Sequence, residues 1–211
     1  NSRPYTAQST HDRPDQGSFE LWAYGAYLVH SPGYAGANAE PYHSYAQDTA
    51  AHNLIKIGGQ SQNRKAGNGF ASYALNDALD AVEADVTQPY EGSGSLKRTV
   101  LYVKPQPGRL GYYVLADRVQ TVQSGAEVAW YLHGLSEEMQ LQGDRDAEWT
   151  VPSWIGGEPV KLRAHVAAPA AKLSVEAAKD SAGRDFEEYA QGSADLRDTK
   201  YLKAVAEQGG D

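Results

Sequence analysis

The 211-residue chain contains no cysteine, one methionine, three phenylalanines and no long hydrophobic run. The absence of cysteine excludes disulfide bonds, thiolate metal ligands and a cysteine nucleophile. Because no apolar run approaches the ~18 residues of a membrane-spanning helix, we expect no membrane partner. The 19 basic and 27 acidic residues give a net charge of −8 without a basic cluster, which argues against a nucleic-acid partner.

Several common enzyme motifs are also missing. The sequence has no G-x-S-x-G elbow, no H-E-x-x-H pair, no P-loop and no EF-hand loop. Acidic pairs such as Glu137-Glu138 and Glu187-Glu188 are typical of solvated surface charge, and a sequence does not give the carboxylate separation of a glycosidase. None of these enzyme templates is therefore supported.

The residues that are abundant indicate a different kind of protein. There are 14 tyrosines, four tryptophans, 21 glycines and 10 prolines. This composition is typical of secreted β-proteins that handle carbohydrate, since an aromatic ring stacks on a sugar while a hydroxyl group bonds to it. An aromatic β-sheet core explains the same composition, so both interpretations stand at this point.

Alternation of apolar and polar residues predicts an all-β chain. Residues 17–30 predict a hairpin that turns at Gly25, and 31–51 predict a long loop. Residues 70–86 resemble a helix in composition, but their nearly alternating acids favour strand. Further strands, at a spacing of about 8–12 residues, are expected in 52–57, 99–103, 112–116, 126–132, 148–151, 159–166, 171–175 and 201–206. The pattern predicts a single antiparallel domain over 1–211, a β-sandwich of two stacked sheets.

Histidine is concentrated near the start of the chain. Four of the six histidines, His11, His30, His43 and His52, fall in the first 52 residues. Histidine suits proton transfer near neutral pH and is the commonest metal ligand. His30 ends one expected strand and His52 begins another, so we expect them at the same rim of the fold. Ordinary histidines at loops and sheet edges are the alternative.

Two segments carry a family resemblance. Residues 11–21 read HDRPDQGSFEL, and residues 49–60 read TAAHNLIKIGGQ. Together they resemble the heparinase II/III-like polysaccharide lyases, whose pattern is roughly H-x-H-x-D-x-G-S-F-x-L, then an Asp-x-Gly element, then A-H-N and a Gly-Gln turn. The strands RTV at 98–100 and VLAD at 114–117 also fit. The strong match covers 11–60 and a weaker one continues to about residue 135.

The resemblance implies a multidomain enzyme. In the family an N-terminal α/α toroid forms much of the substrate cleft, and a C-terminal antiparallel β-sandwich closes it. This chain resembles only the sandwich and opens on Asn1 without methionine. We therefore expect a segment of a longer lyase, secreted or periplasmic in a bacterium, whose sandwich packs on a toroid absent from this chain.

The implied reaction is β-elimination on a uronate-containing polysaccharide. A base removes the C5 proton, the carboxylate is neutralised, and an acid protonates the departing O4. Because the chain lacks the basic clusters that sulfate recognition needs, we prefer alginate or another unsulfated uronan as the acidic polysaccharide partner. A non-catalytic carbohydrate-binding or structural module is the alternative function.

The resemblance assigns roles to individual residues. His11 matches the first histidine of the H-x-H element, which lies in the cleft wall as a catalytic or carboxylate-facing residue. Tyr42 and Tyr45 lie in the loop before A-H-N, from which some relatives take a catalytic tyrosine, and the sequence does not choose between them. Arg13 and His43 are expected to contact the substrate.

The metal ligands of many relatives are altered here. The second histidine of H-x-H is Arg13, the Asp of Asp-x-Gly is His30, and only His52 keeps its type. A zinc site needs at least three donors, and arginine has no lone pair to give. The first possibility is a divalent metal, zinc or similar, on His30 and His52; the second is that the charge of Arg13 replaces it. The candidate third ligands are His43, Asp15 and Glu40.

Three further residues have supporting roles in this interpretation. Asp15 and Ser18 are expected to fix the backbone of the first segment. Asn53 is expected to hydrogen-bond within its own loop.

Overall fold

The computed structural model describes residues 12–31, 45–136, 138–177 and 199–207. In these residues the regular structure is β-strand, with two short 3-10 turns, η2 (Thr49–Ala51) and η3 (Gln88–Tyr90). No helix in the described ranges is long and apolar enough to cross a membrane. The strands are β1 (Leu21–Ala23), β2 (Ala26–Val29), β3 (Ile55–Ile57), β4 (Phe70–Leu75), β5 (Leu79–Asp85), β6 (Gly94–Val103), β7 (Tyr112–Thr121), β8 (Glu127–Leu135), β9 (Gln140–Leu141), β10 (Asp146–Val151), β11 (Val160–His165), β12 (Lys172–Ala177) and β13 (Thr199–Glu207).

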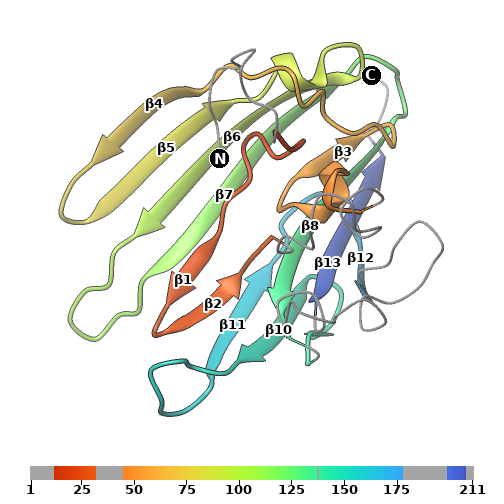
Figure 1. Cartoon of the computed structure of the whole chain (residues 1–211). Helices are drawn as coiled ribbons and strands as arrows, with labels where there is room; N and C mark the ends of the chain where they lie inside the picture. Colours follow the sequence, from red (N-terminus) through yellow and green to blue (C-terminus); the bar gives the residue numbers. More distant parts are fainter. Residues whose placement is uncertain (1–11, 32–44, 137, 178–198, 208–211) are drawn as a thin grey trace.

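The strands form antiparallel sheets, which confirms the expected fold class. Two sheets have four strands, in the orders β4-β5-β6-β7 and β12-β13-β8-β3. A three-stranded sheet, β11-β10-β9, and the β1-β2 hairpin complete the fold. Figure 1 shows the β4–β7 sheet on one side of the molecule and β3, β8, β13 and β12 on the other, with β10 and β11 beside the hairpin. The architecture is a sandwich whose layers are divided among more sheets than the two expected.

The hairpin expected over 17–30 is confirmed. Trp22 pairs with Tyr27 across the two strands, and the turn residues Tyr24 (φ 52°) and Gly25 (φ 73°) are both left-handed. Two such residues form the kind of tight turn whose twist matches that of the flanking strands. Leu21 is buried while Trp22 is 47% exposed, so the alternation separates a core face from a solvent face.

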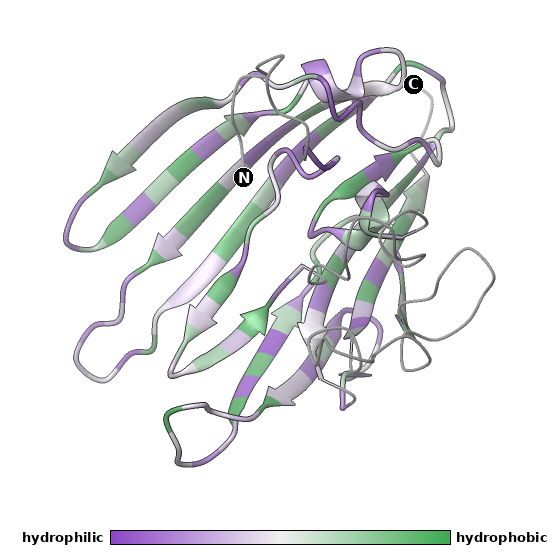
Figure 2. Ribbon diagram, in the orientation of Figure 1, coloured by the Kyte–Doolittle hydropathy of each residue, from purple (hydrophilic) through white to green (hydrophobic). Residues whose placement is uncertain are grey.

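The ambiguous segment 70–86 is a second hairpin, β4 and β5, as its alternation favoured. The side-chain oxygen of Asn76 accepts hydrogen bonds from the backbone N–H groups of Ala78 and Leu79, at 2.9 Å each. This side chain caps a tight turn, which a continuous helix would not contain. Figure 2 shows hydrophobic and hydrophilic residues alternating along β5, as a strand requires.

The strand expected over 201–206 is confirmed as β13, which lies inside its sheet. In the structure β13 lies between β12 and β8 and pairs with both over most of its length. Leu202 is fully buried there, which accounts for the apolar residues of the segment.

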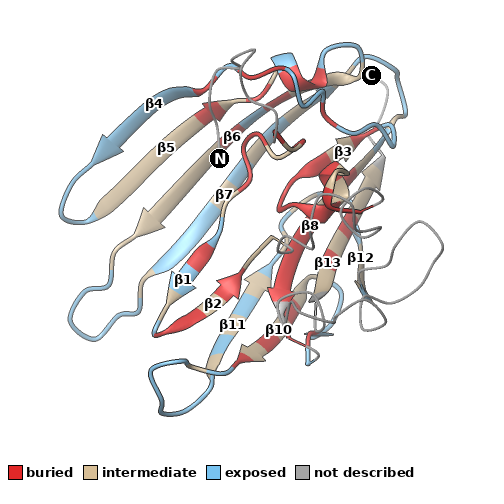
Figure 3. Cartoon of the chain, in the orientation of Figure 1, coloured by how far each residue is buried: buried red, intermediate tan, exposed pale blue. Residues whose placement is uncertain are grey.

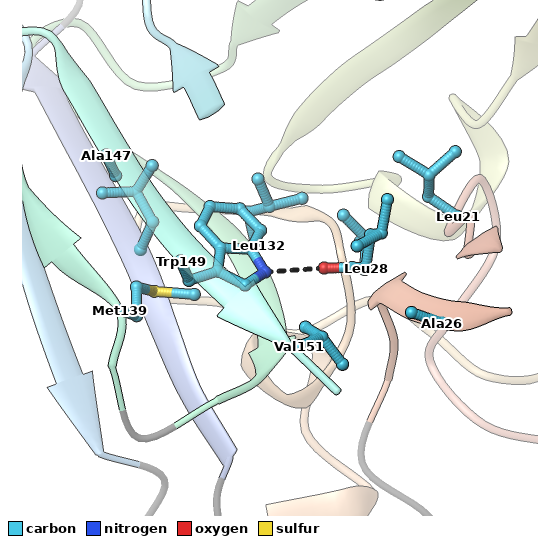
Figure 4. Packing of buried hydrophobic residues seen from close by; sticks show 10 residues of the cluster. Leu21, Ala26, Leu28, Leu132, Met139, Ala147, Trp149 and Val151 are labelled. Carbon is cyan, nitrogen blue, oxygen red and sulfur yellow. Dashed lines mark hydrogen bonds between the residues drawn. The ribbon is translucent and has the colours of Figure 1, made fainter. Parts of the chain in front are cut away.

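One of two cores is organised around Trp149. The indole is 1% exposed, and its Nε1–H donates to the carbonyl oxygen of Leu28 at 2.8 Å (Figure 4). A Cβ atom on Gly134 would lie 2.7 Å from this indole nitrogen, so only glycine leaves room for the ring. This contact fixes β10 and β8 against β2, which carries His30 at its end.

The other core lies between β3, the end of β5 and the start of β6. Leu54, Val86 and Leu96 are fully buried there, and a Cβ on Gly17 (φ 85°) would meet Val86 at 2.8 Å. The distal half of the β4–β7 sheet is open to solvent by contrast, and β4 is exposed along its whole length (Figure 3). Most of the described residues of the two motif segments are buried, whereas residues 58–60 are exposed.

Candidate functional site

The two motif segments are joined by hydrogen bonds through Gln62 and Thr49. Gln62 donates from its side-chain amide to the carbonyl of Gln16 (2.8 Å) and accepts from the Gln16 N–H (2.9 Å). Its own N–H donates to the hydroxyl of Thr49 (2.8 Å), which donates to the carbonyl of Pro14 (3.1 Å). These are buried bonds, so the loop around residues 14–17 has one position relative to 49–62.

Asn53 connects three segments rather than bonding within its loop, so that expectation was wrong. Its side-chain amide donates to the carbonyl of Phe19 (2.7 Å), and its Oδ1 accepts from the N–H of His133 (2.8 Å). Its backbone N–H donates to the Ser18 hydroxyl (3.3 Å), and the Ser18 N–H donates to the carbonyl of Asp15 (3.0 Å). The Ser18 hydroxyl thus has the expected backbone role, whereas Asp15 contributes its backbone carbonyl here and the role of its side chain stays a prediction.

The orientation of Asn53 fixes the proton positions on His133. Because Asn53 Oδ1 accepts from the His133 backbone, it is also the acceptor for His133 Nδ1, 3.3 Å away. The neutral ring then carries its proton on Nδ1 and presents a lone pair on Nε2. The hydroxyl of Tyr45 lies 2.8 Å from Nε2 and must donate to it. Tyr45 is 7% exposed, so its hydroxyl is directed into the protein.

Burial keeps this group of side chains neutral. It lowers the pKa of His133 to about 3, with a further contribution from His52. Burial likewise lowers the pKa of His52 to about 4, assisted by the positive charge of Arg13. Burial also raises the pKa of Tyr45 well above its usual value. At neutral pH both histidines are uncharged and the phenol is protonated.

His30 lies next to this group, at the end of β2. The backbone N–H of His30 donates to the carbonyl of His133 (3.2 Å), and the ring Nδ1 of His30 lies 3.1 Å from a carboxylate oxygen of Glu20. The interaction with the His30 side chain lowers the pKa of Glu20. His30 and His52 both act electrostatically on His133, so the structure brings the two predicted histidines to one region.

The described residues do not by themselves supply a zinc ligand set. No group of three or more metal-binding side chains lies together among them. His52 Nε2 faces the carbonyl of Ala46 at 3.2 Å and so carries its proton there. His30 Nδ1 lies 3.1 Å from Glu20, although the alignment there does not make a hydrogen bond. The charge of Arg13 near His52 opposes a second cation at the same place.

Several predicted site residues lie outside the described ranges. These are His11, Tyr42, His43 and Glu40, and their assigned roles stay predictions. Arg13, which follows closely on His11, is described and half-buried.

Sequence reasoning missed the buried ion pair between Arg98 and Asp117. Arg98 is 1% exposed and meets Asp117 with two bonds of 2.7 Å, Nε to Oδ1 and Nη2 to Oδ2. Its Nη1 donates to the carbonyl oxygens of Gly17 (3.0 Å) and Asn53. Arg98 therefore fixes both motif segments to the β6-β7 pair. The two residues are direct cross-strand partners, so the register of RTV against VLAD would have revealed them.

Comparisons with known proteins give a family and a fold for this chain. Residues 2–205 match the family model described as Heparinase II/III-like, C-terminal. The structure resembles the heparan sulfate lyase HepC from Pedobacter heparinus, with a TM-score of 0.73 and 15% identity over all of this chain and 30% of that one. It also resembles Heparinase III, with a TM-score of 0.57 and 15% identity over 96% of this chain and 31% of that one. At this identity the likeness shows the fold, and the chain spans less than a third of either protein. No curated protein sequence matches the chain.

Proposed function

Because the chain belongs to the heparinase II/III-like family through its C-terminal domain, we propose that it is the β-sandwich part of a polysaccharide lyase. The observation that carries this proposal is the family match over residues 2–205, which includes both motif segments. The network around Asn53 and His133 supports it, since it gives those segments one fixed arrangement. An N-terminal domain would supply the rest of the cleft, and export to the periplasm or the medium would bring the enzyme to its polymer.

The reaction we propose is β-elimination, with His11 in the cleft wall. A carboxylate-facing group and an acid–base pair are what the reaction requires: the C5 proton leaves, charge builds up on the uronate carboxylate, and O4 takes up a proton. Arg13 and His43 would meet the anionic substrate. Tyr42 is preferred to Tyr45 as the catalytic tyrosine, because the Tyr45 hydroxyl is committed to His133.

Arg13 also offers a substitute for the metal of the relatives. Its fixed positive charge already lowers the pKa of His52, so a cation acts at this position without a bound ion. We propose that Arg13 holds the loop in place of zinc. Elemental analysis of the complete protein, purified without chelator, would contradict this by finding stoichiometric zinc.

Two classes of uronate polymer are candidates for the substrate. The absence of a basic cluster makes a highly sulfated polymer the less suitable one, so an unsulfated uronan such as alginate is preferred. Heparan sulfate is the second candidate, because it is the substrate named for the structurally similar HepC. A non-catalytic carbohydrate-binding module is the alternative function, and the altered metal-ligand positions Arg13 and His30 favour it.

The test is a cleavage assay on the complete protein. It is mixed with alginate, heparan sulfate and other uronate polymers, and the ultraviolet absorbance of a 4,5-unsaturated uronate is followed. We expect His11→Ala to lower the rate by about 10²–10⁴-fold, the range of a lost acid–base group. His165→Ala is the control, because His165 is an exposed histidine on β11. Absence of signal with every polymer rejects the lyase, and an unchanged rate for His11→Ala rejects the site.

A further inference from the structure

Three aromatic rings beside the site form a cluster that we call the aromatic platform. They are the exposed Trp22 on β1, the half-buried Tyr27 on β2, and the exposed Trp154 in the loop between β10 and β11. The Trp22 and Tyr27 ring centroids are 4.6 Å apart at an interplanar angle of 70°. Trp154 lies 5.5 Å from each of them, at 67° and 74°. All three contacts are edge-to-face, so the rings do not cover one another's faces as stacked rings would.

The platform is held in place by the backbone beneath it. The backbone N–H of Trp154 donates to the carbonyl of Gly25 (2.8 Å), and the Ser153 hydroxyl donates to the carbonyl of Tyr24 (2.9 Å). A Cβ on Gly25 would lie 2.6 Å from the side chain of Ile155, so the loop sits directly on the hairpin turn. A site positioned in this way loses little conformational entropy when a ligand binds.

Burial in the core does not explain these tryptophans. Trp154 is 67% exposed and Trp22 is 47% exposed, whereas Trp149 at 1% has the core role. Adjoining exposed indoles are unfavourable in water unless another surface covers them, and they mark a binding site more often than single exposed residues do.

The platform is continuous with polar groups of the candidate site. The Tyr27 ring lies 4.8 Å from the ring of His30, which pairs with Glu20 at 3.1 Å. The side chain of Glu20 is half-exposed, and a carboxylate there accepts hydrogen bonds from hydroxyl groups. Aromatic faces beside a hydroxyl acceptor suit a sugar.

We infer that the aromatic platform is a subsite on which one pyranose ring of the polymer stacks. The C–H face of a pyranose is apolar and weakly positive, and it complements the negative face of an indole, while the hydroxyl groups at its edge reach the carboxylate of Glu20. That negative charge favours a hydroxyl-bearing face over a sulfated one. The identity of the polymer rests on the proposed function, whereas stacking itself does not.

The direct test is chemical protection in the complete protein. N-bromosuccinimide oxidises accessible indoles, and peptide mass spectrometry reads each tryptophan separately. We expect Trp154 and Trp22 to react and Trp149 to resist. Oligosaccharides of a uronate polymer should slow oxidation of Trp154 by at least fivefold. The inference is overturned if no oligosaccharide slows the oxidation of Trp154. It is also overturned if Trp154 and Trp22 are already inaccessible to the reagent without ligand.

Variants separate this inference from the proposed activity. Trp154→Ala should raise KM about tenfold with kcat within about twofold, and Trp154→Phe should recover most of the loss. The control Tyr112→Ala removes an exposed aromatic of β7 and should leave KM unchanged. Cleavage with neither protection nor a KM effect rejects the platform alone, whereas protection without cleavage rejects the lyase alone. Melting temperatures of the variants show whether each one folds.

Discussion

Acidification from pH 7 to pH 5 should destabilise the chain by about 4 kcal/mol through His52 and His133. Both are buried and neutral, with pKa values lowered from 6.5 to about 4 and about 3. As the pH falls below 6.5 the unfolded chain takes up two protons that the native state does not bind. Stability is therefore present above the unfolded pKa and is lost between pH 6.5 and the folded values. Between pH 7 and pH 5 each histidine contributes about 2 kcal/mol of this loss.

Urea unfolding followed by tryptophan fluorescence at pH 7 and pH 5 measures this difference. His133→Gln should remove about half of the pH dependence, and His52→Gln serves the same purpose if the first variant does not fold. The exposed His165 provides the matched control, His165→Gln, which should keep the full dependence. A loss below about 1 kcal/mol between the two pH values would refute the assignment of buried neutral histidines.

Further substitutions test the network that fixes the motif segments and the choice of catalytic tyrosine. Arg98→Met should lower the free energy of unfolding in urea by about 3–5 kcal/mol, because Asp117 is left largely buried and unpaired. Adding Asp117→Leu should restore much of this loss. A loss under about 1 kcal/mol for Arg98→Met would contradict the assigned role of the ion pair. Tyr45→Phe should lower the free energy of unfolding by about 1–3 kcal/mol, because the His133 ring loses its hydrogen-bond donor. The Tyr45→Phe variant should keep cleavage activity, whereas Tyr42→Phe should abolish that activity. The reverse pattern of activities would assign the catalytic role to Tyr45.

The sequence predicted best what depends on neighbouring residues. The hairpin around Gly25 follows from local alternation and a turn residue, and the strands of 70–86 follow from alternation that outweighs helical composition. β9 was missed because two residues, Gln140 and Leu141, carry no period. The family resemblance from 11–21 and 49–60 is confirmed by the match over 2–205.

The site was predicted less completely because its contacts are distant in sequence. Asn53 and His133 are 80 positions apart, and Arg98 reaches Gly17 across 81. No local pattern encodes which residue a β-strand register places opposite another. The sequence therefore places His133 only in a strand, although its ring accepts a hydrogen bond from Tyr45 and His52 acts on it electrostatically. The contacts of His133 form only when β8, which carries it, has paired with β13 and β3 in their sheet.

The central claim is that the protein cleaves a uronate polymer by elimination. Digestion by the complete protein in isotopically labelled water tests it, with mass spectrometry of the products. We expect a fragment with a 4,5-unsaturated, ultraviolet-absorbing end that is lighter by one water than a hydrolysis product. With the label on the oxygen of water, this end should be free of label, because elimination adds no oxygen from water. Saturated fragments that carry the label, or no fragment from any uronate polymer, would contradict the claim.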